Sequence, residues 1–218
     1  MSLTRRNFII GLGTVIFFTG PCRAGNAEAG TRTRYAMIHD ESRCTGCNLC
    51  ARACRKTHRV PRQGSRLSIL HIPLAEDEQA TTYRYFRQAC QHCDQAPCID
   101  VCPTGASWRD ENGIVRVNPA DCIGCGYCVS ACPYQARYLD PRRHVADKCD
   151  FCCESRLAKG FPPICVSVCP QQALIFGDEE SPEIKRWLQG NRYEQYWLPG
   201  TGKPHQYRRA AQHVIPKG

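Results

Sequence analysis

Sixteen of the eighteen cysteines in this chain of 218 residues fall into four groups of four, and this repetition constrains the fold more than any other feature. Each group begins with Cys-x2-Cys and ends with Cys-x3-Cys, and three of the last cysteines are followed by Pro103, Pro133 and Pro170. The groups are Cys44/Cys47/Cys50/Cys54, Cys90/Cys93/Cys98/Cys102, Cys122/Cys125/Cys128/Cys132 and Cys149/Cys152/Cys165/Cys169.

This spacing is the one that binds [4Fe–4S] clusters, because a cube of iron and sulfur needs one thiolate on each iron. Three closely spaced cysteines cover three corners of the cube. The fourth cysteine lies about one helical turn further on and ligates the other cluster of a pair. The following proline ends that helical turn, since it disfavours the helical conformation of the residue before it. We therefore predict four [4Fe–4S] clusters, which would form a path for single electrons.

The order of the groups predicts which cysteines share a cluster. The two middle groups are neighbours in the sequence, so we pair them, and the first and fourth groups form a second pair. Exchange of the last cysteine within each pair then predicts four sites: site 1 with Cys44, Cys47, Cys50 and Cys169; site 2 with Cys54, Cys149, Cys152 and Cys165; site 3 with Cys90, Cys93, Cys98 and Cys132; and site 4 with Cys102, Cys122, Cys125 and Cys128.

Two further residues lie next to these motifs. Cys153 fits the spacing less well than Cys152, so we interpret it as a thiol outside the ligand sets, and an exchange of roles with Cys152 stays open. His92 lies inside the second cysteine loop, but the sixteen cysteines already complete the four sets. We predict no histidine ligand and no catalytic residue.

Three other uses of cysteine explain the pattern less well. Disulfides do not require Cys-x2-Cys-x2-Cys-x3-Cys-Pro, and certainly not in repeated form. Structural zinc is bound by paired Cys-x2-Cys knuckles rather than by three close cysteines and a fourth. A redox-sensing thiol would need no such repetition.

The formal net charge of +9 would suit a nucleic-acid-binding protein, but it omits the clusters. Each oxidised cluster with its four thiolates carries about −2, so four of them contribute about −8. Basic residues near the cysteine loops are expected to offset this charge and raise the reduction potentials, with ordinary solvated side chains as an equal alternative for each one taken singly; they are Arg43, Arg52, Arg55, Lys56 and Lys148. We predict no nucleic-acid partner.

The N-terminus resembles a twin-arginine export signal. It reads TRRNFI at residues 4–9, continues as an apolar run to Phe18, and has small residues around 27–29 that suit cleavage. Ile10 departs from the lysine that is frequent in such signals. This route carries folded proteins, so clusters assembled in the cytoplasm would survive export. We expect a periplasmic protein attached to the inner membrane through a partner, with an uncleaved anchor as the alternative.

The predicted fold class is α+β, with two ferredoxin-like lobes of short strands and short helices built around four clusters. Strands are expected at 35–38, 83–86, 114–117, 137–139 and 173–176, and a polar connection at 58–82. The predicted segments are a signal at 1–29, ferredoxin-type units at 35–65, 81–112 and 113–142, a fourth cluster-binding segment at 143–177 and a C-terminal tail at 178–218. The aromatic tail suits docking on a partner or packing back over a lobe.

From about residue 35 to 176 the chain resembles the four-cluster iron–sulfur subunits of respiratory oxidoreductases, such as dimethyl sulfoxide, polysulfide, thiosulfate and tetrathionate reductases. Within that group it is most similar to the NrfC-type proteins of formate-dependent nitrite reduction. The likeness lies in HDES at 39–42, CQHCD at 90–94, DVCPTGAS at 100–107 and DKCDFC at 147–152. The family's ligands match the sixteen cysteines without a gap.

The resemblance implies an electron-transfer subunit rather than an enzyme with its own substrate. Such proteins relay electrons from the quinol pool, through an integral-membrane quinol-oxidising subunit, to periplasmic c-type cytochromes. Related subunits serve molybdopterin catalytic subunits, and the cluster motifs do not distinguish the two. A self-sufficient enzyme is disfavoured, because the sequence has no nucleotide-binding fingerprint and no Ser/His/Asp pattern.

Overall fold

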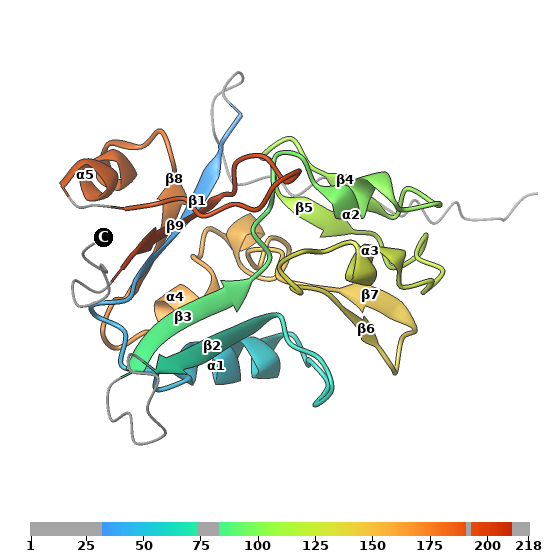
Figure 1. Cartoon of the computed structure of the whole chain (residues 1–218), viewed down its shortest axis with the longest axis horizontal. Helices are drawn as coiled ribbons and strands as arrows, with labels where there is room; N and C mark the ends of the chain where they lie inside the picture. The colour runs from blue at the N-terminus through green and yellow to red at the C-terminus, as the bar shows by residue number, and fades with distance from the viewer. Residues whose placement is uncertain (1–31, 74–82, 191–192, 211–218) are drawn as a thin grey trace, which may run out of the picture.

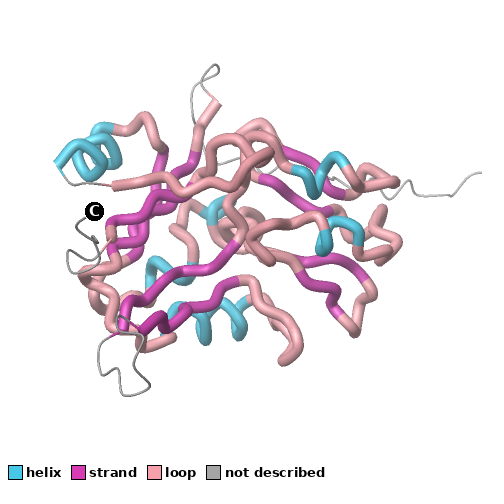
Figure 2. Tube along the Cα trace, viewed as in Figure 1, coloured by secondary structure: helices cyan, strands magenta, loops and turns pink. Residues whose placement is uncertain are grey.

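The structure is a computed structural model that describes residues 32–73, 83–190 and 193–210, so the predicted export signal lies outside the described residues. Short strands and short helices alternate along the chain, which confirms the predicted α+β class (Figures 1 and 2). The strands are β1 Tyr35–Asp40, β2 Leu67–Pro73, β3 Tyr83–Ala89, β4 Ser107–Arg109, β5 Val115–Val117, β6 Tyr138–Asp140, β7 Val145–Asp147, β8 Leu174–Asp178 and β9 Gln206–Arg209. The α-helices are α1 Leu49–Thr57, α2 Pro97–Asp100, α3 Tyr127–Ser130, α4 Ile164–Ser167 and α5 Pro182–Gly190, and η1 Leu157–Lys159 is a 3-10 turn.

The helices that contain cysteines pack in two pairs. Helix α1 packs against α4, and α2 packs against α3. Figure 1 shows the first pair with β1, β2, β3, β8 and β9 on the left, and the second pair with β4 to β7 on the right. The beginning and the end of the cysteine-rich region therefore lie together, and its middle forms the other side of the molecule.

The four sheets in the described part of the chain are small. β1 lies between β8 and β9, antiparallel to β8 and parallel to β9. The pairs β2–β3, β4–β5 and β6–β7 are antiparallel hairpins. Strands of three residues bury too few side chains to form a core alone. The cysteine loops between them consequently supply much of the buried surface.

Buried cysteines form part of both larger apolar clusters. One cluster contains Met37, Ile114, Phe151 and Leu174 together with Cys50, Cys54, Cys90, Cys149, Cys153 and Cys165. The other contains Val115 and Ala146 with Cys93, Cys98 and Cys128. Cysteines occupy core positions that aliphatic side chains such as leucine would fill in a larger domain. The folded state of such a core depends on what the thiols bind.

Residues 58–82 are more than a polar connection. Strand β2 lies within this stretch and pairs with β3 from Leu67 opposite Ala89 to Pro73 opposite Tyr83. Leu67 and Ile69 are buried, whereas Leu70 and Ile72 are about 40% exposed. Only one face of β2 is therefore covered. Because of this, its apolar residues give a weak strand signal in the sequence.

The described part of the tail packs back onto the rest of the chain. β9 pairs with β1 from Met37 opposite Gln206 to Asp40 opposite Arg209. Ile184 of α5 is buried against Ala36 and Ile38.

Among the helices of the described residues, none has the length and apolar character that crossing a bilayer requires.

Candidate cluster sites

Each cysteine loop turns through a left-handed residue directly before its second cysteine. These residues are Gly46, His92, Gly124 and Phe151, with φ of 69°, 51°, 70° and 55°. The conformation is free for glycine and costs about 1–2 kcal/mol for other residues. Turns that combine right- and left-handed residues gather backbone N–H groups into a concavity that suits an anion. All four loops thus share this left-handed turn, although only two contain glycine at this position.

The third cysteine of each group is the second residue of a helix. Cys50, Cys98, Cys128 and Cys165 hold this position in α1 to α4, and all four are buried. The helices α2, α3 and α4 are four residues long and precede Cys-Pro, whereas α1, whose last cysteine has no proline after it, is nine residues long. The expectation that proline ends the helical turn is confirmed.

After the last cysteine, the chain folds back onto the sulfur. The N–H groups of Ala136 and Ala173 donate to Cys132 Sγ at 3.5 Å and to Cys169 Sγ at 3.3 Å. Ser107 N–H donates to Cys102 Sγ at 3.4 Å. Such bonds favour the thiolate form. Burial opposes ionisation of Cys102, but its hydrogen bonds from Ser107 and Thr104 outweigh this effect and lower its pKa.

The structure brings together thiols from distant groups on one side of the molecule. Burial raises the pKa of Cys44, and the nearby Cys169 and Cys47 raise it further. Burial also raises the pKa of Cys54, with contributions from Cys149, Cys165 and Cys152. Four neighbouring thiols of this kind remain protonated on their own. They suit a cationic metal centre, because binding to a metal ion deprotonates a thiol.

The other side repeats this arrangement. Burial raises the pKa of Cys93 to about 12, and the neighbouring Cys90, Cys98 and Cys132 contribute. For the fourth predicted set, Cys102 follows α2, while Cys122, Cys125 and Cys128 lead into α3, and α2 packs against α3.

Exposure differs among the four predicted sets. The cysteines of site 2 are all buried, as are Cys90, Cys93 and Cys98 of site 3. By contrast, Cys47 of site 1 and Cys125 of site 4 are exposed. Site 2 is thus wholly buried, site 3 is buried except for the half-buried Cys132, and sites 1 and 4 reach the surface.

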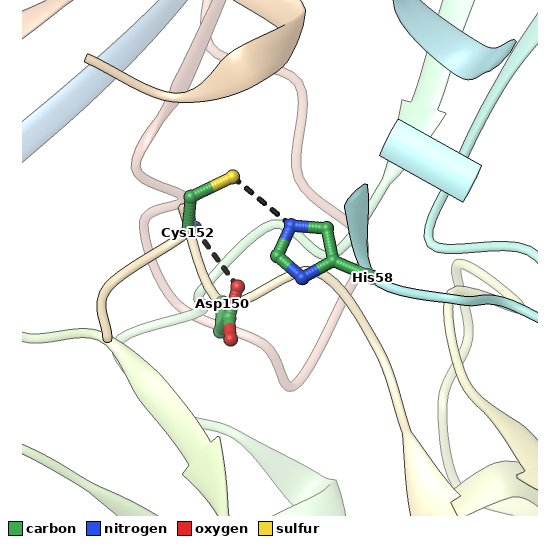
Figure 3. Close-up of side chains that lie close together, drawn as sticks. All are labelled: His58, Asp150 and Cys152. Atoms are coloured by element: carbon green, nitrogen blue, oxygen red, sulfur yellow. Dashed lines mark hydrogen bonds between the residues drawn. The ribbon is translucent and has the colours of Figure 1, made fainter. Parts of the chain in front are cut away.

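One group of three possible ligands in the described residues lies close enough together for a single metal ion: His58, Asp150 and Cys152 (Figure 3). His58 Nδ1 accepts a hydrogen bond from Arg66 Nη1 at 2.9 Å, so the proton of the neutral ring is on Nε2, 3.1 Å from Cys152 Sγ. Asp150 accepts the Cys152 N–H at 2.8 Å and pairs with Arg66 at 3.2 Å. The Asp150 carboxylate is thus already occupied by Arg66 and the Cys152 N–H, which leaves no complete set of ligands for a separate metal ion. We therefore interpret His58 as a hydrogen-bond donor to the cluster ligand Cys152 rather than as a ligand.

Of the five basic residues expected near the loops, only Lys148 is buried. Its ammonium group donates to the carbonyls of Val115 and Cys149. Arg43, Arg52, Arg55 and Lys56 are exposed, where solvent screens their charge.

Sequence reasoning missed two arginines that are more buried than those four. Arg87 at the end of β3 and Arg137 before β6 are 3% and 5% exposed. Each lies a few residues from a cysteine group, in a run of residues typical of a strand. A charged residue in such a run indicates a partner in the interior.

Comparison with known proteins identifies the fold family. Residues 81–179 match a 4Fe-4S dicluster domain, and residues 37–56 match a 4Fe-4S binding domain. The chain is 68% identical to the uncharacterized ferredoxin-like protein YdhX of Escherichia coli K12, over all of this chain and 99% of that protein. It is 46% identical to NrfC of the same organism, over 95% of this chain and 96% of NrfC.

A third relative has a named role. The chain is 48% identical to the thiosulfate reductase electron transfer subunit PhsB of Salmonella typhi, over 83% of this chain and 94% of PhsB. These matches confirm both the predicted cofactor type and the predicted resemblance. The chain belongs to the family of ferredoxin-type electron-transfer proteins that includes NrfC and PhsB, and it binds [4Fe–4S] clusters.

Proposed function

We propose that the protein is a four-cluster electron wire with no substrate of its own. Sites 1 and 2 would form one ferredoxin-like lobe and sites 3 and 4 the other. The packing of α1 on α4 and of α2 on α3 supports this division, because it brings the first cysteine group to the fourth and the second to the third. The clusters supply one-electron chemistry, and the chain supplies spacing, insulation from water and hydrogen bonds to the sulfurs.

The exposure of the cysteines is the observation that carries this proposal. A wire needs two ends that partners can reach and an interior that water cannot. Cys47 and Cys125 would be such ends, and the buried cysteines of sites 2 and 3 such an interior. We therefore infer the order site 1, site 2, site 3, site 4, in either direction.

We further propose that electrons come from membrane quinol through an integral-membrane partner and pass to a periplasmic c-type cytochrome. Likeness to NrfC over nearly the whole chain supports this route. The alternative is a molybdopterin catalytic subunit as the acceptor. It is supported by the likeness to PhsB and by 48% identity to the polysulfide reductase B protein of Wolinella succinogenes, over 70% of this sequence and 80% of that protein.

Metal analysis of protein purified without oxygen tests the cluster count. We expect about sixteen irons per chain, no stoichiometric zinc, and paramagnetic resonance signals after reduction by dithionite. Zinc in place of iron, or a colourless protein without signals after reduction, would refute the wire.

Isolation of the native complex decides between the two acceptors. A chromosomally tagged chain would be purified anaerobically after mild crosslinking, and the preparation assayed for covalent haem and for molybdenum. Haem without molybdenum supports the cytochrome route, and molybdenum without haem supports the alternative.

Export is tested by replacement of the two signal arginines. Because the twin-arginine route recognises this pair, Arg5→Lys together with Arg6→Lys should leave the protein in the cytoplasm with its clusters intact. Cell fractionation and immunoblotting measure this. Unchanged delivery to the periplasm would contradict the proposal.

A further inference from the structure

The Arg87 guanidinium is buried near cysteines of predicted sites 1 and 2. Burial opposes its charge, but Cys165, Cys149, Cys50 and Cys54 outweigh burial and raise its pKa. The guanidinium lies close to Cys165. Its Nη1 also donates to Gln206 Oε1, whose amide nitrogen in turn donates to the Cys90 carbonyl. Within the described residues no carboxylate pairs with Arg87, so this buried charge faces sulfur.

Arg137 is likewise buried near cysteines of predicted sites 3 and 4. Burial opposes the positive charge of Arg137, but the nearby Cys98, Cys90 and Cys128 outweigh this effect and raise its pKa. The guanidinium lies close to Cys128. Its Nη1 donates to Ser107 Oγ at 2.8 Å, and the Ser107 N–H donates to Cys102 Sγ.

The two arginines correspond closely. Each contacts the third cysteine of a group at the start of a short helix, Cys165 or Cys128. Each is held by one neutral side chain through Nη1. In both, Nε and Nη2 have no hydrogen-bond partner among the described residues. A buried guanidinium with unpaired donors is costly unless an anion is close, and a cluster with its four thiolates is such an anion.

We propose that Arg87 and Arg137 set the reduction potentials, each placing one permanent positive charge between the two clusters of one lobe. This inference rests on the proposed wire. Reduction adds one electron to one cluster, supplied by the donor protein or by dithionite in vitro, and no bond is made or broken. A fixed positive charge stabilises the more negative, reduced state, and it acts on both clusters because it lies beside both.

Arginine suits this role for two reasons. Its guanidinium stays charged at any working pH, so the potentials would not depend on a local protonation. Its several N–H donors form a planar fork that can contact sulfur on two sides at once. Removal of one arginine should therefore change two clusters together and leave the other two unchanged.

Redox titration of the intact protein, followed by paramagnetic resonance, tests this directly. The variants are Arg87→Gln and Arg137→Gln, with Arg87→Lys and Arg137→Lys to retain the charge. Arg116→Gln is the matched control, since its side chain is only 13% exposed but pairs with Glu154. Iron content is measured for every variant.

We expect each glutamine variant to bind wild-type iron and to show two clusters with lowered potentials. The reduced-to-oxidised ratio of these two clusters at fixed ambient potential should fall at least tenfold, which is about 59 mV for a one-electron couple. Arg87→Gln and Arg137→Gln should affect different pairs. The lysine variants should stay within about threefold of wild type, and Arg116→Gln should not differ.

Full iron with no shift in either glutamine variant would overturn the proposal, as would equal shifts of all four clusters. If both glutamine variants lose iron while both lysine variants keep it, the clusters require a positive charge at these two positions, and this result supports the proposal. Loss of iron in the lysine variants as well would indicate a steric role and overturn it. A wild-type protein without iron would instead refute the wire itself.

Discussion

The imidazole ring of His92 packs on the phenyl ring of Phe151 with 4.0 Å between their centroids. Both residues directly precede the second cysteine of a loop, His92 in the second group and Phe151 in the fourth. The contact therefore joins the loop of predicted site 3 to the loop of predicted site 2. Both side chains are fully buried, and Val115 N–H donates to His92 Nδ1 at 3.1 Å. These two rings thus form a direct contact between the second and the fourth cysteine loops.

Truncation of Phe151 should weaken this junction. Phe151 also packs edge-on against Phe176 at 5.1 Å, so Phe151→Ala leaves a cavity between three elements. The expected cost is about 3–5 kcal/mol, or a melting temperature lowered by roughly 10 °C in anaerobic thermal unfolding. Phe161→Ala is the control, because Phe161 is 57% exposed, and it should change the melting temperature little. Equal effects of the two substitutions would contradict this packing.

Two glycines with the same backbone conformation should respond differently to alanine. Gly124 and Gly105 have φ of 70° and 69°. A Cβ on Gly124 would lie 2.4 Å from the His144 carbonyl oxygen, whereas a Cβ on Gly105 meets nothing within 4 Å. Gly105→Ala should cost about 1–2 kcal/mol and keep all iron. Gly124→Ala should distort the loop of site 4 and lose about four irons per chain, measured by metal analysis. Full iron in Gly124→Ala would show that the loop can shift.

Serine substitution should separate ligand cysteines from Cys153. Cys125→Ser should remove or convert one cluster, since serine is a poor replacement for a thiolate ligand at iron. Cys153 is buried and disulfide-bonded rather than a free thiol, so Cys153→Ser should keep all four clusters, although loss of this bond can lower stability. Iron content and the resonance spectrum of the reduced protein measure both. Loss of a cluster in Cys153→Ser would overturn the ligand set of site 2.

The hydrogen bond from His58 to Cys152 should raise the potential of one cluster. Removal of the donor in His58→Leu leaves the thiolate charge less stabilised. The bond contributes about 1 kcal/mol, so the reduced-to-oxidised ratio of the site 2 cluster should fall about fivefold at fixed ambient potential. His71→Leu, at an exposed position on β2, is the control. A redox titration in which both variants match wild type would remove His58 from this role.

The pH dependence of stability should report on His205. Burial and the nearby Arg34 lower its pKa to about 4, whereas the unfolded chain has an ordinary value near 6.5. Between these values the unfolded chain binds more protons, so the free energy of unfolding falls as the pH falls. His205 contributes up to about 1.4 kcal/mol per pH unit to this slope.

His205→Asn preserves a donor toward the Tyr35 carbonyl, which His205 Nδ1 contacts at 2.9 Å, and should flatten the slope. Denaturant unfolding at pH 6.5 and pH 5 under anaerobic conditions measures the difference. His71→Asn should leave the slope unchanged. An unchanged slope in His205→Asn would show that the buried histidine does not control this dependence.

Local features of the chain were predictable from the sequence. Strands expected at 35–38, 83–86, 114–117, 137–139 and 173–176 overlap β1, β3, β5, β6 and β8. The prolines after Cys102, Cys132 and Cys169 end their helical turns for a reason that acts between adjacent residues. Strands β2, β4 and β7 were not expected, and β9 depends on β1, a partner distant in the sequence.

The sequence by itself determined the cofactor, because the spacing of thiols within each loop is a local covalent property that [4Fe–4S] clusters require. The sharing of cysteines between groups stays a prediction, which the packing of α1 on α4 and α2 on α3 supports. Only the tertiary structure decided the burial of Arg87 and Arg137 and the contact between His92 and Phe151. Burial and long-range contact are properties of packing, and no residue carries them in its own identity.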